Sequence, residues 1–198
     1  MSTAPRPNAT WADLARLPEG TRAEIVDGQI LFAPSPGPQH QGIGSRVLGF
    51  LGLPFDFDDN PGGWWILHDI DVELAPSTVL QPDVAGWMRS RVPDFPSERP
   101  IRIRPDWVCE IVSPSSVRLD RLRKTAIYLE AGVPFFWIID PEARLLEAFQ
   151  ALDGRWLRLG AWSEGDRARI PPFDAVELDV GRLFPPQPRG AAPPDGRD

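Results

Sequence analysis

The segment from Asp106 to Asp140 constrains the fold more than any other, because apolar runs and chain breakers alternate closely within it. Residues 106–112 are short and mostly apolar, as is typical of a buried strand. The Ser113-Pro-Ser-Ser116 stretch ends that strand, and residues 118–131 then carry apolar side chains at helical spacing up to Gly132. Residues 135–139 form a continuous apolar run, which favours a central strand. The segment therefore predicts strand, break, helix and strand in that order.

The rest of the chain also mixes helices and strands. A short helix is expected after Thr10, a tight hairpin at Asp27-Gly28, and a longer helix from near His40. The further strands are expected at residues 22–26, 29–33, 64–74, from Asp83 onward after Pro82, and in a meander formed by residues 144–149 and 155–161. This mixture predicts the α/β (α+β) class.

The length of 198 residues, with 42% hydrophobic residues, suits one well-packed domain. We expect that domain to span residues 1–184, followed by a disordered tail at 185–198 that is rich in Pro, Gly and Ala. The apolar runs are too short to cross a bilayer, and the N-terminus lacks a signal-peptide core, so we expect a cytoplasmic protein. Cys109 has apolar neighbours, which indicates a buried thiol.

The charge of the chain restricts its partners. A formal net charge of −7 argues against tight, nonspecific adhesion to polyanions such as nucleic acid. The charge is uneven, however, because residues 99–124 contain seven basic and three acidic side chains. The sequence therefore leaves room for a locally basic face on an acidic protein.

Lys124 is the only lysine among 21 basic residues. Lysine and arginine are nearly interchangeable at solvated positions, so Lys124 is either a chance survivor or a site that needs a compact ammonium. Asp120 lies one helical turn earlier, and an ion pair with it is the plain structural interpretation. Both interpretations stay open at the level of the sequence alone.

Two acids stand in or beside apolar strands. Asp83 opens one strand, and Glu110 lies inside another, where an unpaired carboxylate would be costly or would take up a proton. An arginine could be the partner of Glu110. Alternatively, Asp83 and Glu110 could hold Mg²⁺ or Mn²⁺ together with a backbone carbonyl and waters. Such a metal would activate a water toward a phosphate, and Lys124 could orient that water or stabilise the developing charge.

Taken in order, these motifs resemble the Uma family of restriction-endonuclease-like proteins, a branch of the PD-(D/E)XK nuclease superfamily. The resemblance covers roughly Leu17 to Phe149 and rests on Glu24, Asp27-Gly28, Pro34 to His40, Pro82-Asp83, Glu110 to Ser115, Asp120, Lys124, Tyr128, Gly132-Val133 and Phe136 to Pro141. It implies a mixed β-sheet core flanked by helices, with the antiparallel meander added. It also implies a metal-dependent endonuclease that hydrolyses DNA, with Asp83 and Glu110 as metal ligands and Glu24 as an accessory catalytic acid.

The chain departs from the superfamily pattern at one position. The pattern places a lysine two residues after the second acid, where this chain has Val112. Lys124 would then have to reach the acids from the following helix. The alternative is a catalytically inactive nuclease-fold module that binds or regulates, and the direction in which Lys124 points distinguishes the two.

His40 and Tyr128 are candidate accessory residues. His40 could approach the metal or a phosphate, although a surface or capping role is commoner for such a histidine. Tyr128 lies one helical turn beyond Lys124, where it could position the ammonium or only pack. The family and double-strand cleavage favour a homodimer acting on DNA.

Overall fold

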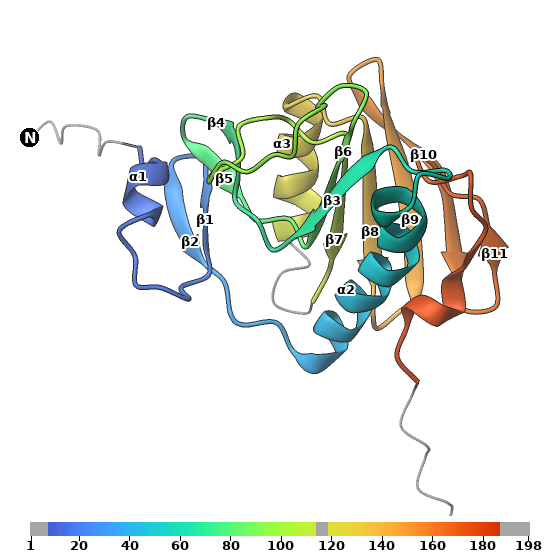
Figure 1. Cartoon of the computed structure of the whole chain (residues 1–198). Helices are drawn as coiled ribbons and strands as arrows, with labels where there is room; N and C mark the ends of the chain where they lie inside the picture. Colours follow the sequence, from blue (N-terminus) through green and yellow to red (C-terminus); the bar gives the residue numbers. More distant parts are fainter. Residues whose placement is uncertain (1–7, 114–118, 187–198) are drawn as a thin grey trace, which may run out of the picture.

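Strands β7 (Trp107–Ile111) and β8 (Phe135–Asp140) run parallel at the centre of a six-stranded sheet (Figure 1). The computed structural model describes residues 8–113 and 119–186, and for residues 119–121 the backbone alone. Of the expected break at Ser113 to Ser116, only Ser113 is among the described residues, and residues 114–116 lie outside them. The expected disordered tail, apart from residues 185 and 186, also lies outside them. Strand, helix and strand follow one another between Trp107 and Asp140 in the predicted order.

Antiparallel strands flank this parallel pair. β6 (Val84–Met88) and β3 (Trp64–His68) continue the sheet beyond β7, and β9 (Leu145–Leu152) and β10 (Arg155–Ser163) continue it beyond β8. The last two strands pair antiparallel as the predicted meander, with both residues of the Asp153-Gly154 turn at positive φ. One parallel pair in an otherwise antiparallel sheet makes the sheet mixed, which confirms the expected fold class.

Helices cover both faces of the six-stranded sheet. The helix α2 (Pro38–Leu51) packs Ile43, Val47 and Leu51 against one face. The helix α3 (Thr125–Glu130) follows a π-helical turn, η2 (Leu119–Lys124), and packs Ile127 and Tyr128 against the other. The sheet is therefore apolar on both faces, which explains the continuous apolar runs of its central strands.

Alternation along β7 decides which face each of its side chains meets. Trp107, Cys109 and Ile111 belong to the core beneath α2, and Val108 belongs to the core beneath α3. Successive side chains of a strand point to opposite faces, so Glu110 points to the α3 face. A carboxylate thus enters an otherwise apolar layer at the end of a central strand.

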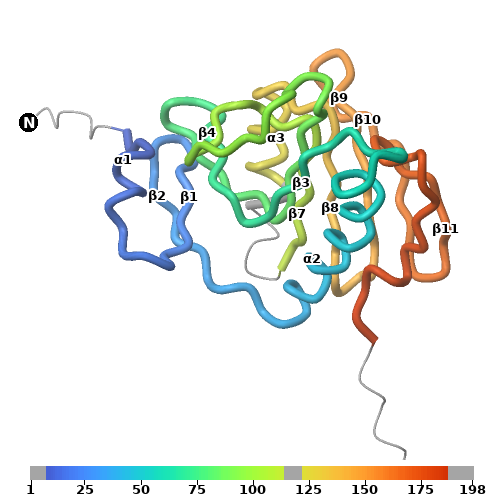
Figure 2. Tube along the Cα trace, in the orientation of Figure 1, coloured from blue at the N-terminus to red at the C-terminus, as the bar shows by residue number. Residues whose placement is uncertain are grey.

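A four-stranded sheet stands beside the main one, as the trace in Figure 2 shows. Its order is β2 (Gln29–Phe32), β1 (Ala23–Val26), β5 (Thr78–Leu80) and β4 (Val72–Ala75), and α1 (Trp11–Leu14) packs on it through Leu14. The turn between β1 and β2 is Asp27-Gly28, with φ of 52° and 74°. Positive φ at both turn residues is typical of a two-residue hairpin, and the predicted hairpin is confirmed.

Two predicted elements differ from the structure. The expected strand at residues 64–74 is wrong, because β3 ends at His68 and the chain resumes as β4 in the other sheet. Asp69 turns the chain at a φ of 48°, a conformation that Asp adopts more easily than most residues, and alternation of apolar residues does not reveal such a turn. The expected helix at 118–131 is α-helical only from Thr125, after the wider π-helical turn.

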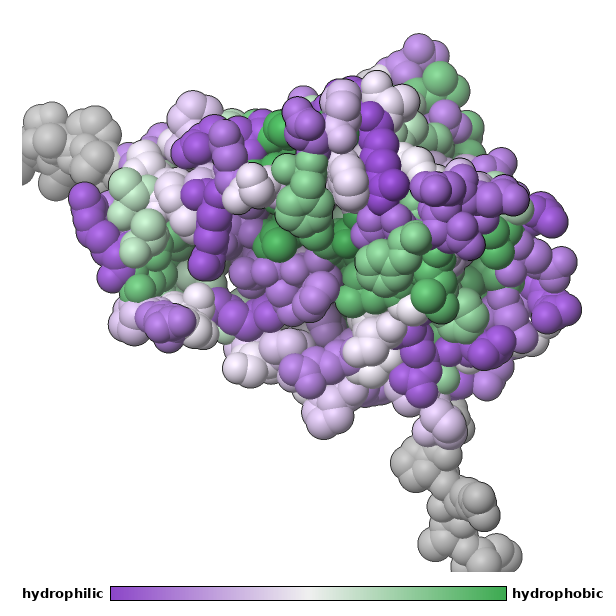
Figure 3. All heavy atoms as spheres, in the orientation of Figure 1, coloured by the Kyte–Doolittle hydropathy of each residue, from purple (hydrophilic) through white to green (hydrophobic). Residues whose placement is uncertain are grey.

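The remaining elements are short. They are η1 (Gly52–Phe57) after α2, the two-stranded pair β11 (Arg167–Ala168) and β12 (Leu178–Asp179), and η3 (Val180–Leu183). Hydrophilic side chains cover much of the face in Figure 3, with apolar surface gathered between them. No helix of the described residues is both long and apolar enough to span a membrane.

Candidate active site

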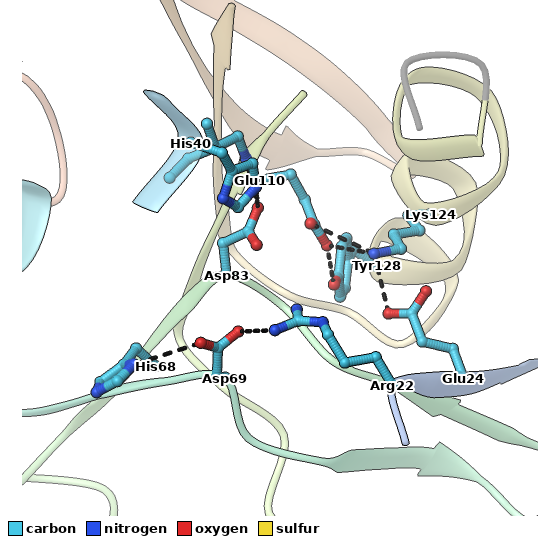
Figure 4. Close-up of polar contacts among 10 residues, drawn as sticks. Arg22, Glu24, His40, His68, Asp69, Asp83, Glu110, Lys124 and Tyr128 are labelled. Carbon is cyan, nitrogen blue, oxygen red and sulfur yellow. Dashed lines mark hydrogen bonds and ion pairs between the residues drawn. The ribbon is translucent and has the colours of Figure 1, made fainter. Parts of the chain in front are cut away.

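A cavity of about 170 Å³ opens between the small sheet, the ends of β6 and β7, and the start of α2. Glu24, Asp83, Glu110 and Lys124 all line it, together with His40 (Figure 4). These residues come from five separate elements or their edges, so only the folded chain brings them together. The structure therefore gathers in one cavity the four residues that the sequence proposed as catalytic.

Glu110 is 2% exposed, and its carboxylate contacts the side chains of Lys124 and Tyr128. The Tyr128 hydroxyl donates a 2.6 Å hydrogen bond to Glu110 Oε1. The Lys124 ammonium lies 3.3 Å from Oε1 and 3.4 Å from Oε2 of the same carboxylate. A charge buried this deeply is stable only with such partners, and Lys124 and Tyr128 are among them.

Lys124 ends the π-helical turn η2 and points inward, with only 7% of its side chain exposed. Its Nζ lies 2.9 Å from Glu24 Oε1, in addition to its contacts with Glu110. Lys124 is therefore no solvated surface residue, and the side chain of Asp120 lies outside the described residues. Val112, at the position where the superfamily has its lysine, is buried in the core beneath α3.

Asp83 lies immediately before β6. The last printed pair at this end of the two strands is Val84 with Cys109, so Asp83 and Glu110 are the next residues along β6 and β7. One carboxylate oxygen of Asp83, Oδ2, accepts a 2.7 Å hydrogen bond from the backbone N–H of Ile111. The two acids thus stand at the ends of neighbouring strands and line the same cavity.

His40 lies in the first turn of α2, 3.2 Å from Asp83 Oδ2 through its Nε2. Burial opposes its protonation, but the hydrogen bond and the negative charge of Asp83 outweigh burial and raise the pKa of His40 above its ordinary value. Gly37, not His40, is the N-cap of the helix. His40 therefore belongs to the cavity rather than to the helix cap.

Glu24 reaches the cavity from β1 in the small sheet. Its Oε1 accepts a 2.7 Å hydrogen bond from the backbone N–H of Gln81 and lies beside the Lys124 ammonium. Val26, two residues on, packs in the core beneath α3, so Glu24 points to the same side as Glu110. Glu24 thereby ties Lys124 to the small sheet.

Side chains of the cavity can supply only some of the oxygen ligands that a divalent cation such as Mg²⁺ needs. Among residues 8–113 and 119–186, no three His, Cys, Asp or Glu side chains come together closely enough to hold a metal ion. Asp83 and Glu110 do line one cavity. Mg²⁺ commonly keeps several waters and takes one or two carboxylates, so the carboxylates of Asp83 and Glu110 suit it as the protein ligands.

Arg22 and Asp69 belong to this region and were not anticipated. Arg22 lines the cavity, and its Nη1 donates a 2.9 Å hydrogen bond to Asp69 Oδ1. Arg22 precedes Glu24 by two residues in an extended segment, so the strand period could have placed both on one face. Asp69 gave no such signal, because it sits at the unpredicted turn between β3 and β4.

A larger cavity, of about 370 Å³, lies beside α1 and includes Trp11, Asp71 and Arg99 in its walls. The buried carboxylate of Asp71 accepts a 2.8 Å hydrogen bond from Arg99 Nε. An acid neutralised in this way by an arginine is an ordinary structural pair. The cluster around Glu110 is the stronger candidate because it combines buried acids with a buried lysine.

Comparisons with known proteins identify the family and the fold of this chain. A family model described as Uma2, putative restriction endonuclease, matches residues 11–181, which include every residue of the cluster. The crystal structure of a putative nuclease belonging to DUF820 from Anabaena variabilis is similar, with a TM-score of 0.70 and 20% identity, over 89% of this chain and 97% of that one. That likeness shows the fold. No curated protein matches the sequence.

Proposed function

Since this chain belongs to the Uma2 family of putative restriction endonucleases, we propose that it is a metal-dependent endonuclease that hydrolyses DNA phosphodiester bonds. The supporting observation is the position of Lys124. The only lysine of the chain is buried between Glu24 and Glu110, although it comes from the helix rather than from the usual strand position. This places a buried positive charge directly beside Glu110, where it can stabilise negative charge that develops on a bound phosphate.

In this proposal Asp83 and Glu110 hold the metal. When bound, Mg²⁺ or Mn²⁺ would supply positive charge to a phosphate oxygen and acidify the attacking water. Lys124 would stabilise the negative charge that grows on the phosphate during cleavage. Tyr128 orients the Glu110 carboxylate, and Glu24 fixes the Lys124 ammonium from the opposite side.

A nuclease-fold protein that binds or regulates without cleaving is the second candidate. Val112 stands where the superfamily has its lysine, and the net charge of −7 disfavours a polyanionic partner. In that case the contacts of Lys124 with Glu24 and Glu110 would be structural only.

Cleavage of supercoiled plasmid DNA separates the two functions. We expect nicking in Mg²⁺ or Mn²⁺ by the purified protein, no nicking in chelator, and loss of nicking in Asp83→Ala and Glu110→Gln. Asp94→Ala, which removes an exposed acid in the lining of a different cavity, serves as the control and should keep activity. Equal nicking by all variants, or nicking that survives chelation, would contradict the proposal.

A further inference from the structure

Arg22 enters the active-site cavity from the position just before β1. Figure 4 shows its side chain extending from that strand toward Asp69. About a quarter of the side chain, 24%, is exposed. Arg22 is therefore a second cation at the cavity, and unlike Lys124 it keeps contact with solvent.

Asp69 holds one edge of the Arg22 guanidinium. The contact is a 2.9 Å hydrogen bond from Nη1 to Asp69 Oδ1. The Nε atom of Arg22 is shielded from solvent and has no hydrogen-bond partner among the described residues. A guanidinium offers five N–H donors in a rigid fork, and a buried donor without an acceptor is unfavourable. Because this Nε atom is shielded, an acceptor from outside the protein can reach Arg22 only through the quarter of its side chain that is exposed.

Asp69 is itself fixed beside the catalytic cluster. It turns the chain between β3 and β4 at a φ of 48°, and its backbone N–H lies 3.4 Å from the carbonyl oxygen of Asp83. The Asp69 carboxylate thus anchors the guanidinium next to the strand end that carries Asp83. Such an anchor reduces the freedom that Arg22 would lose on binding a ligand.

The cavity has more negatively than positively charged side chains near Lys124, so an additional cation that faces the substrate would favour phosphate binding. Three carboxylates line it, those of Glu24, Asp83 and Glu110, and the Lys124 ammonium is engaged by two of them. The chain as a whole carries a net charge of −7, so it offers no general attraction to a polyanion. A local, fork-shaped donor adds attraction for a phosphate to what a bound metal and Lys124 would supply.

We propose that Arg22 binds a backbone phosphate of the substrate strand and so positions the strand across the cavity. The inference rests on the proposed nuclease function and adds a substrate-binding residue to it. Arg22 contacts the phosphate through the exposed part of its side chain, while Asp69 keeps the side chain in place.

The test is the salt dependence of binding to a short DNA duplex, measured in chelator so that no strand is cut. Arg22→Met should weaken binding on the order of tenfold and lower the slope of log Kd against log salt by about one. Arg16→Met is the matched control, because Arg16 also pairs with an aspartate, Asp13 at 3.2 Å, but is 76% exposed outside the cavity. The control should leave affinity and slope as in the wild type.

Asp69→Asn separates binding from a merely structural ion pair. Asn tolerates the positive φ of this position and keeps an amide oxygen that can accept the hydrogen bond from Arg22, so that the variant removes only the negative charge beside the guanidinium. If Arg22 binds phosphate, Asp69→Asn should bind DNA more tightly than the wild type. If the pair is structural only, Asp69→Asn and Arg22→Met should weaken binding equally, and the inference is overturned.

Melting followed by circular dichroism checks that each variant is folded. Arg22→Lys is the second variant, which keeps the charge but loses the fork, and it should retain the salt slope while binding more weakly. If the wild type cleaves and binds DNA but Arg22→Met matches Arg16→Met, only the role of Arg22 fails. If the wild type binds no DNA at any salt concentration, the proposed function fails with it.

Discussion

The ammonium of Lys124 lies 2.9 Å from Glu24 Oε1 and 3.3 Å from Glu110 Oε1, so one buried cation joins the small sheet to the central sheet. The three side chains are each less than one-tenth exposed. Removing one member of such a group leaves the others as uncompensated buried charges. The candidate catalytic residues are therefore also structural residues, and the two roles must be measured separately.

Lys124→Met should lower both stability and activity. The loss of stability should be about 3–5 kcal/mol, because two buried carboxylates lose their cation. The cleavage rate should fall on the order of a hundredfold or more at a temperature where the variant remains folded. Urea denaturation and plasmid nicking measure the two effects.

Lys124→Arg is the companion variant. It keeps the charge and so should recover part of the stability, but its planar fork does not match the space of an ammonium and should recover little activity. A stability loss below about 0.5 kcal/mol in Lys124→Met would mean that the lysine is solvated, against the structure.

Tyr128→Phe should remove one charge-assisted hydrogen bond and little else. Tyr128 is fully buried, and its hydroxyl donates to Glu110 Oε1 at 2.6 Å. We expect a loss of about 1.5–3 kcal/mol in the free energy of unfolding. A double-mutant cycle with Glu110→Gln gives the control, since the effect of Tyr128→Phe should shrink when the carboxylate is already gone. Additive effects would show that the hydroxyl acts elsewhere.

Asp83→Asn should abolish metal binding while the chain stays folded. The amide oxygen of Asn can still accept the 2.7 Å hydrogen bond from the Ile111 backbone N–H, but the negative charge is lost. Titration calorimetry with Mn²⁺ should show binding to the wild type and none to this variant. Asp94→Asn, at an exposed position, should bind Mn²⁺ like the wild type. Unchanged Mn²⁺ affinity in Asp83→Asn would place the metal elsewhere.

Cys109 should react with thiol reagents only when the protein unfolds. It is 0% exposed on the α2 face of β7, and burial raises the pKa of its thiol well above the ordinary value. Labelling with a chromogenic disulfide should be slow in buffer and rapid in denaturant. The same assay reports whether each active-site variant keeps a closed core. Rapid labelling of the native wild type would contradict the packing of α2 on β7.

The sequence predicted the central part of the fold because its signals are local. The apolar run at residues 135–139 and the turn at Asp27-Gly28 fix a strand and a hairpin without reference to the rest of the chain. The turn at Asp69 left no such signal, since a single residue at positive φ does not interrupt the alternation around it. For this reason the sequence predicted one strand at residues 64–74, where the structure has β3 and β4 in different sheets.

The candidate site was only partly accessible from the sequence. Asp83 and Glu110 stood out as acids beside or within apolar strands, and Lys124 stood out by its rarity. The contact between Lys124 and Glu24 joins residues from different sheets and depends on the π-helical turn that aims the lysine inward. The pairing of Arg22 with Asp69 depends on the unpredicted turn, so it appears only in three dimensions.

The most direct test of the site is a crystal structure of the wild-type protein with Mn²⁺, using the anomalous signal of the metal. The proposal predicts a peak in the cavity in contact with the carboxylates of Asp83 and Glu110, with the Lys124 amine on the same side of the sheet. Absence of that peak at a saturating Mn²⁺ concentration, with Lys124 still paired to Glu24 and Glu110, would contradict the proposal and favour the inactive binding module.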